Sequence, residues 1–167
     1  IIRDNEIGEN RYGITILGNN LFALIEQNNI LDNNIQNAPM LGGSGINLSG
    51  DSSSLAIITE NSISGNLWGV TVQQTFKVNM GDGHIGGSNP GLNTFRENMN
   101  SGNTFALFNN TPNSINATNN CWDLTKTPTL QHAEDVISHV VDDSSLGEVF
   151  FDPISTCTPV AIESHNS

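Results

Sequence analysis

Two stretches of the chain, residues 5–16 and 61–72, share one arrangement of asparagine, glycine and apolar residues. In each, a glycine follows an asparagine at a distance of eight residues and opens a short apolar alternation, as Gly13 does after Asn5. The full unit is 23 residues from Asn5 to Asn28 and 24 from Gly45 to Gly69. A pattern that recurs with its internal distances intact is an internal repeat, which restricts the chain to folds built from stacked units.

Two units carry polar insertions. Asn28 and Gly45 lie 17 residues apart instead of eight, and the surplus falls in residues 31–44, which contain Gly and Pro. Gly69 and Asn93 lie 24 apart, and the surplus falls in residues 80–91, whose composition is typical of a loop. Residues 104–107 and Asn120 follow the pattern more loosely. The repeat therefore predicts about five units.

Each unit carries short apolar alternations of the kind that strands with one buried face show. The pairs are Ile2/Ile7, Ile14/Ile16, Ile25/Ile30, Ile46/Leu48, Ile58/Ile63, Val70/Val72, Leu92/Phe95, Phe105/Leu107 and Ala117/Trp122. Such short strands form no stable sheet alone, but equivalent strands of successive units pair above and below and bury their apolar side chains in columns. Frequent Asn and Gly, which accept sharp corners, suit this arrangement. The pattern predicts a parallel β-solenoid.

The asparagines at fixed spacing are the expected turn residues of this solenoid. Equivalent residues of stacked strands lie about 4.8 Å apart, so their side-chain amides can hydrogen-bond along the stack as a ladder. The predicted ladder contains Asn5, Asn28, Asn61, Asn93 and Asn120. For any one of them alone, an ordinary polar turn residue is the alternative.

The blocks Ile-x-x-Asn-x-Ile and Gly-Ile-x-Leu resemble the right-handed parallel β-helix repeats of the pectate-lyase-like superfamily. Residues 111–122 resemble the last rung of large secreted bacterial β-helix proteins, and so do residues 142–153. The resemblance implies an all-β, right-handed parallel β-helix of about five rungs with a C-terminal α/β cap. It also implies an extracellular or cell-surface location, as part of a larger protein.

The pattern changes after Trp122, which is expected in the core. Residues 1–122 are predicted as β-helix rungs, 123–153 as the cap and 154–167 as a polar tail. Thr127 and Pro128 are suited to open a helix that continues to about Val141, and residues 148–152 are predicted as a strand. The other end has no such cap, so the edge around Ile1 and Ile2 is expected to be covered by preceding rungs or by neighbouring subunits.

The two cysteines, Cys121 and Cys157, are predicted to form a disulfide. It would close a loop of 36 residues and stabilise the fold by about 3–4 kcal/mol in the chain-entropy model. Two unrelated buried thiols are the alternative.

Five Lys and Arg against seventeen Asp and Glu leave a net charge of −12. Nucleic-acid binding needs clustered basic residues, so it is not expected, and neither is docking to an anionic membrane surface. No apolar window is long enough for a membrane span. The charge predicts a soluble, self-repelling surface; no cofactor is expected, and Ca²⁺ binding is the alternative.

No catalytic residue and no set of metal ligands is predicted. Candidate ligand-binding residues are Asp82 and His84 in the second insertion, Arg96 beside Glu97, and Trp68 as an exposed platform for a sugar. Gly83 and His84 resemble the Gly-His-Gly element of polygalacturonase-type hydrolases, but the preceding units carry Asn and Ser where the acid and base would stand. His132 and His139 are expected on a solvated helix flank.

The sequence favours a non-catalytic structural or adhesive β-helix module of an extracellular bacterial protein. One alternative is a polysaccharide lyase or glycoside hydrolase whose site lies in the insertions or in rungs upstream of Ile1. Another is carbohydrate binding without turnover.

Overall fold

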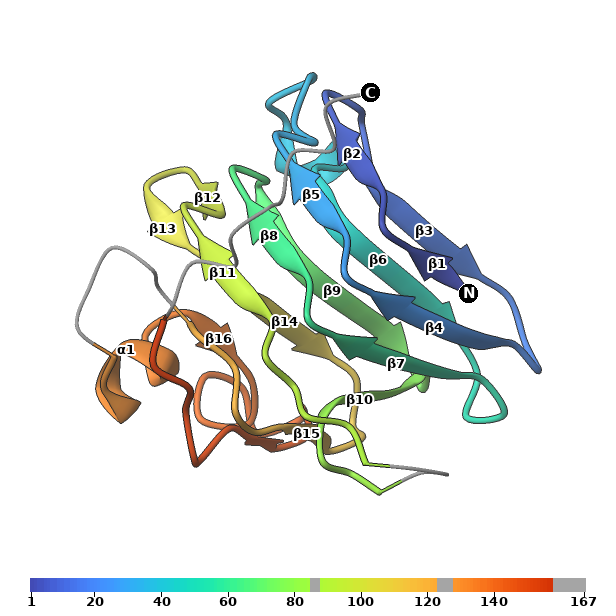
Figure 1. Cartoon of the computed structure of the whole chain (residues 1–167), viewed down its shortest axis with the longest axis vertical. Coiled ribbons are helices and arrows are strands. Elements are labelled where there is room, and N and C mark those ends of the chain that lie inside the picture. Colours follow the sequence, from blue (N-terminus) through green and yellow to red (C-terminus); the bar gives the residue numbers. More distant parts are fainter. Residues whose placement is uncertain (85–87, 123–127, 158–167) are drawn as a thin grey trace.

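The computed structural model describes residues 1–84, 88–122 and 128–157. The protein is all-β, with mostly parallel sheets and very little helix. The chain visits three sheets in turn and then returns to the first, so each sheet gains one strand in each of the first four passes (Figure 1). On the fifth pass only the first and third sheets gain a strand.

The bounds of the elements follow this order. The first sheet contains β1 (Ile2–Arg3), β4 (Phe22–Glu26), β7 (Leu55–Thr59), β10 (Lys77–Gly81), β15 (Ile115–Ala117) and β17 (Val149–Phe150). The second contains β2 (Glu6–Gly8), β5 (Asn29–Leu31), β8 (Ser62–Ser64) and β11 (Thr94–Arg96). The third contains β3 (Ile14–Leu17), β6 (Ser44–Gly50), β9 (Trp68–Gln74), β14 (Leu107–Asn110) and β16 (Ile137–Ser138). Outside these sheets lie η1 (Pro39–Leu41), α1 (Leu130–Glu134) and the antiparallel pair β12 (Met99–Asn100) and β13 (Asn103–Thr104).

The parallel register stacks the predicted apolar residues in columns. These columns are Ile2–Ile25–Ile58, Ile7–Ile30–Ile63–Phe95, Ile14–Ile46–Val70–Leu107–Ile137 and Ile16–Leu48–Val72. Most of their members are fully buried in one continuous core. Full burial of an Ile or Val side chain contributes about 1.5–3 kcal/mol, so the stack stabilises strands that are too short to persist singly.

Leu92 is a correction to the predicted pairs, because it is 43% exposed. It occupies the corner position directly before Asn93, where the backbone is left-handed with φ of 59°. The same position in other rungs is held by Asp4, Gln27 and Glu60, with φ of 55–56°. A residue at such a sharp corner directs its side chain to solvent, so the inward member of this pair is Phe95 alone.

The C-terminal part of the described chain extends two of the sheets. β16 pairs with β14 in the third sheet, and β17 pairs with β15 in the first. Trp122 is buried, as predicted, and its ring stacks on Phe95 with centroids 5.0 Å apart.

The predicted helix is present as α1, but its predicted extension to Val141 is wrong. Thr127 lies outside the described residues, and α1 is capped instead by Thr129, whose side chain accepts the His132 N–H at 3.1 Å. The helix ends at Glu134 because Ile137, opposite Leu107, pairs with the edge of β14 as a strand. The predicted strand at 148–152 is present in shorter form as β17, and residues 158–167 of the predicted tail lie outside the described residues.

Candidate functional site

Two ladders of asparagine side chains are the most extensive polar feature of the described residues. In the first, the side-chain oxygen of each member after Asn5 accepts both the backbone N–H and the Nδ2 of the asparagine one rung before it, at 2.9–3.1 Å. Its members are Asn5, Asn28, Asn61, Asn93 and Asn120. This is the predicted ladder, and it is confirmed.

A second ladder, which sequence reasoning missed, runs parallel to the first. Its members are Asn10, Asn33, Asn66 and Asn98, joined in the same way at 2.9–3.2 Å. Each lies five residues after a member of the first ladder, on the other side of a strand of the second sheet. The signal was a hexad, Asn-x-apolar-x-x-Asn, that recurs in the first four units.

The ladders also bind the backbone. The Nδ2 of Asn61 donates to Thr59 O in its own rung and to Ile25 O in the preceding rung, both at 2.9 Å. Both ladders flank the second sheet and fix its strands in register. Buried amides that are fully hydrogen-bonded rigidify a core, whereas unpaired ones destabilise it.

Asp82 and His84 form a local pair after β10. His84 Nδ1 lies 2.9 Å from both the backbone O and the Oδ1 of Asp82, and the hydrogen bond is directed at the backbone oxygen. The His84 side chain is 78% exposed. Asn79 holds the base of this loop, because its Oδ1 accepts the N–H groups of Gly81 and Gly83, each at 3.0 Å.

Asn79 has one unsatisfied group. Its side chain is buried, and no hydrogen-bond partner of Nδ2 lies within the described part of the chain. Asn116 is opposite Asn79 in the next rung, and Asn89 donates its Nδ2 to Asn79 O at 3.0 Å. The base of the second insertion is thus a cluster of amides rather than of carboxylates.

Arg96 and Trp68 lie elsewhere. The Arg96 Nε is 3.6 Å from a carboxylate oxygen of Glu97, and both side chains are more than half exposed. Trp68 is half-buried and belongs to an aromatic cluster, with ring centroids 4.6 Å from Phe105 and 5.4 Å from Phe108. The structure therefore brings together only Asp82 and His84 among the four candidates.

His139 is a further residue that sequence reasoning misplaced. Its side chain is buried rather than solvated. The Nδ1 atom accepts the Val149 N–H at 3.1 Å, which leaves Nε2 as the protonated nitrogen that donates to Glu134 Oε1 at 3.0 Å. His139 therefore joins α1 to β17.

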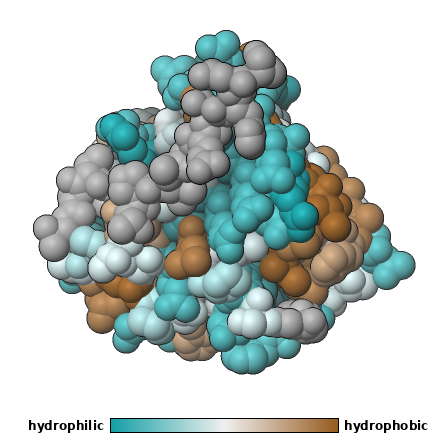
Figure 2. Space-filling view, in the orientation of Figure 1, coloured by the Kyte–Doolittle hydropathy of each residue, from teal (hydrophilic) through white to brown (hydrophobic). Residues whose placement is uncertain are grey.

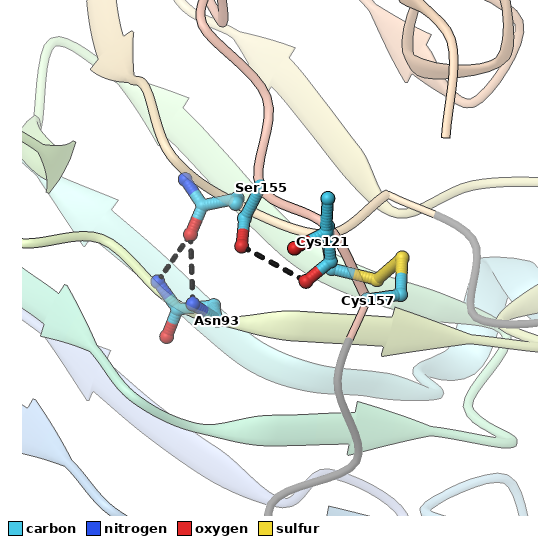
Figure 3. Close-up of a disulfide and its surroundings, with 6 residues drawn as sticks. Asn93, Cys121, Ser155 and Cys157 are labelled. Atoms are coloured by element: carbon cyan, nitrogen blue, oxygen red, sulfur yellow. Dashed lines mark hydrogen bonds between the residues drawn. A yellow bond between two sulfur atoms is a disulfide. The ribbon is translucent and has the colours of Figure 1, made fainter. Parts of the chain in front are cut away.

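The disulfide predicted between Cys121 and Cys157 is present, with Cα atoms 5.1 Å apart. It lies directly beside the last step of the first ladder, where Asn93 donates to Asn120 (Figure 3). Ser155 N–H donates to Asn120 O at 2.9 Å, so the segment before Cys157 is fixed to the same rung.

Across residues 1–84, 88–122 and 128–157, no group of three or more His, Cys, Asp or Glu side chains is placed to hold a metal ion. Within those same ranges, no helix has the length and apolarity to span a bilayer.

In comparisons with known proteins, no protein-family model, no curated protein and no solved structure matches this chain.

Proposed function

We propose that the protein is a non-catalytic structural or adhesive module built on a right-handed parallel β-helix of the pectate-lyase-like kind. The observation that carries this proposal is the use of the aligned polar positions. At the corners of successive rungs these positions hold asparagines that hydrogen-bond to one another, from Asn28 through Asn120. A β-helix hydrolase would need aligned carboxylates as acid and base, whereas amides in a ladder serve the scaffold.

The module is proposed to belong to an extracellular or surface protein of a bacterium. Its disulfide supports this, because disulfides persist in oxidising compartments and are rare in the cytosol. Its partners are preceding rungs or neighbouring subunits at the edge formed by β1, β2 and β3, together with a polysaccharide if the adhesive role is carbohydrate-directed.

Two assays on the oxidised protein test this proposal. Beads coated with the folded chain are expected to be retained on bacterial-surface polysaccharide or protein films more than beads coated with the reduced, unfolded chain. Incubation with acidic and neutral polysaccharides, with and without Ca²⁺, is expected to release no new chain ends. Release of chain ends that is abolished in an Asp82→Asn, His84→Ala variant would contradict the non-catalytic role and favour the hydrolase or lyase.

Carbohydrate binding without turnover is a second candidate, favoured by the aromatic cluster around Trp68. Aromatic faces bind the apolar faces of sugar rings, and the Trp68 ring packs against the rings of both Phe105 and Phe108. Oligosaccharides are expected to change Trp68 fluorescence, whereas Trp122, which is buried against Phe95, serves as the internal reference. The signal of a Trp68→Phe variant should then not respond.

A further inference from the structure

The strands β1, β2 and β3, with Asn5 and Asn10, form one end of the stack, which we term the N-terminal edge. Each strand is the last of its sheet, with a neighbour on one side only. Outer N–H and C=O groups of such strands are available for pairing. The chemistry of this edge specifies its partner.

In both ladders each asparagine except the last donates to the asparagine of the following rung. The side-chain oxygens of the first rung therefore have no donor before them within the described part of the chain. In the interior, the Oδ1 of Asn28 or Asn33 accepts two hydrogen bonds from the asparagine of the preceding rung. The Oδ1 atoms of Asn5 and Asn10 accept none from the described residues, although both amides donate onward to the next rung. The partner must therefore present amide donors at both positions.

The backbone of β2 makes a matching demand. In successive rungs Asn29 N–H donates to Asn5 O at 2.8 Å, and Ser62 N–H donates to Asn28 O at 2.9 Å. Glu6 is in register with Asn29 and Ser62. By the alternation of a parallel ladder its N–H points away from β5, toward the open side. The partner must supply a carbonyl there, at the position of its own ladder asparagine.

Apolar surface completes the edge. Ile25 and Ile30 are fully buried by rungs on both sides, but their counterparts Ile2 and Ile7 are only half-buried. Ile1, directly before β1, is 84% exposed. Figure 2 shows hydrophobic surface gathered at this end, where β1 and β4 lie.

We propose that the N-terminal edge binds one further rung of the same repeat, which carries the hexad Asn-x-apolar-x-x-Asn and is joined to the chain before β1. The proposal rests on the β-helix of the proposed function and decides between its two partners. Such a rung supplies both amide donors, the carbonyl for Glu6 and an apolar column. Its path needs only a short corner, since residues 18–21 already connect β3 to β4 in this way.

A second copy of the chain does not fit. Two N-terminal edges facing each other would set Oδ1 acceptors against Oδ1 acceptors. The opposite end of the stack carries β16 and β17. Beyond β11 the second sheet continues there only as a bridge from Thr94 to Cys121, so among the described residues this end presents no further strand with the hexad to pair with β2.

The experiment adds one rung before β1. A copy of residues 55–78, which form a rung without insertion, is fused directly before Ile1, and amide hydrogen exchange is followed by NMR. Exchange at Glu6 is expected to slow about tenfold or more relative to the parent chain. The matched variant carries Asp at both copied asparagines, which keeps their shape but removes the amide donors. It is expected to protect Glu6 much less.

Equal protection by the two copies, or none by either, would overturn the proposal. A parent chain that dimerises in sedimentation, with Glu6 protected only in the dimer, would also overturn it in favour of a second copy. If a fusion does not fold, the free 55–78 peptide titrated into the parent chain replaces it, with the same readout. Exchange at the Asn29 N–H distinguishes the stacked fold from the further rung. Free exchange of Asn29 would refute the stacked fold, whereas a protected Asn29 beside an unprotected Glu6 would refute only the further rung.

Discussion

The side-chain oxygen of Asn61 accepts two hydrogen bonds from Asn28, one from the backbone N–H and one from Nδ2, both at 3.0 Å. Asn61 is 1% exposed, and it repeats the same donation toward Asn93. One residue thus satisfies two donors of the rung before it and uses an acceptor of the rung after it. Because water cannot replace these bonds at a buried site, the ladder is a sensitive place to test the fold.

Asn61→Ala is expected to lower the free energy of unfolding by about 3–5 kcal/mol. The change removes the common acceptor of two Asn28 donors and the donor to Ile25 O, and each buried group left unpaired costs about 1–3 kcal/mol. Urea unfolding followed by circular dichroism measures the loss.

Asn5→Ala is the matched control for Asn61. Asn5 is exposed, and its Oδ1 accepts no hydrogen bond from the described residues, so its replacement is expected to cost about 1 kcal/mol or less. Similar losses in the two variants would contradict the dependence of the ladder on burial.

Gly69→Ala is expected to destabilise the protein by about 3 kcal/mol through a backbone clash. A Cβ at Gly69 would lie 2.3 Å from Ala106 O in the next rung, and overpacking of this kind costs about 1–3 kcal/mol, occasionally more. Gly102→Ala is the control: a Cβ there meets no atom within 4 Å, and only its φ of 86° is unfavourable, so about 1 kcal/mol is expected. Thermal unfolding should rank the two variants in this order.

The stacking of rungs could be predicted because Asn5, Asn28 and Asn61 combine a regular spacing with a residue type that suits corners. Each of these asparagines is followed two residues later by an inward isoleucine, half-buried at Ile7 and fully buried at Ile30 and Ile63, which fixes both the corner and the inward face. The disulfide was predictable for a simpler reason, since only two cysteines are available.

The second ladder was missed because Asn33 falls at the start of an insertion, where an asparagine is expected in any loop. The corners before the first ladder could not be recognised by glycine either, because Gln27 and Glu60 adopt the left-handed backbone conformation there. In the C-terminal segment the apolar spacing from Leu130 to Val141 suits a helix, but the open edge of β14 takes Ile137 as a strand instead. Tertiary pairing overrides local propensity there.

The carboxyl of Asp51 provides a pH test of a corner. The Ser53 hydroxyl, followed by the Ser53 N–H, donates to this carboxylate and holds its pKa below the usual value. A group with a lowered folded pKa stabilises the fold above its unfolded pKa of about 3.9, and this contribution is lost as pH falls through the folded pKa. The Ser53→Ala change is expected to raise the pKa of Asp51 toward its usual value, which an NMR titration of the variant measures.

Asp143 serves as the internal reference in that titration. Its pKa is also lowered, by the backbone N–H and then the hydroxyl of Ser145, which the Ser53 change does not touch. A shift of both carboxyls, or of neither, would refute the local cause at Asp51.

His139→Ala is expected to destabilise the described C-terminal part by about 2–3 kcal/mol. The change leaves the Val149 N–H without its acceptor in a buried position and removes the donor to Glu134. His139→Asn, whose oxygen can accept in place of Nδ1, should recover part of the loss. His84→Ala, at a largely exposed side chain, should change little in the same denaturant titration.

Reduction of the Cys121–Cys157 disulfide is expected to lower the free energy of unfolding by about 3–4 kcal/mol, because a loop of 36 residues is released in the unfolded chain. Cys157→Ala should show the same loss without reductant and no further change with it, which separates the crosslink from other effects of the reagent. Since the disulfide lies beside the Asn93–Asn120 step, amide exchange of Asn93 should accelerate on reduction, whereas that of Asn28, three rungs away, should not. An unchanged Asn93 in a destabilised, reduced chain would assign the effect wholly to the unfolded state and not to the last rung.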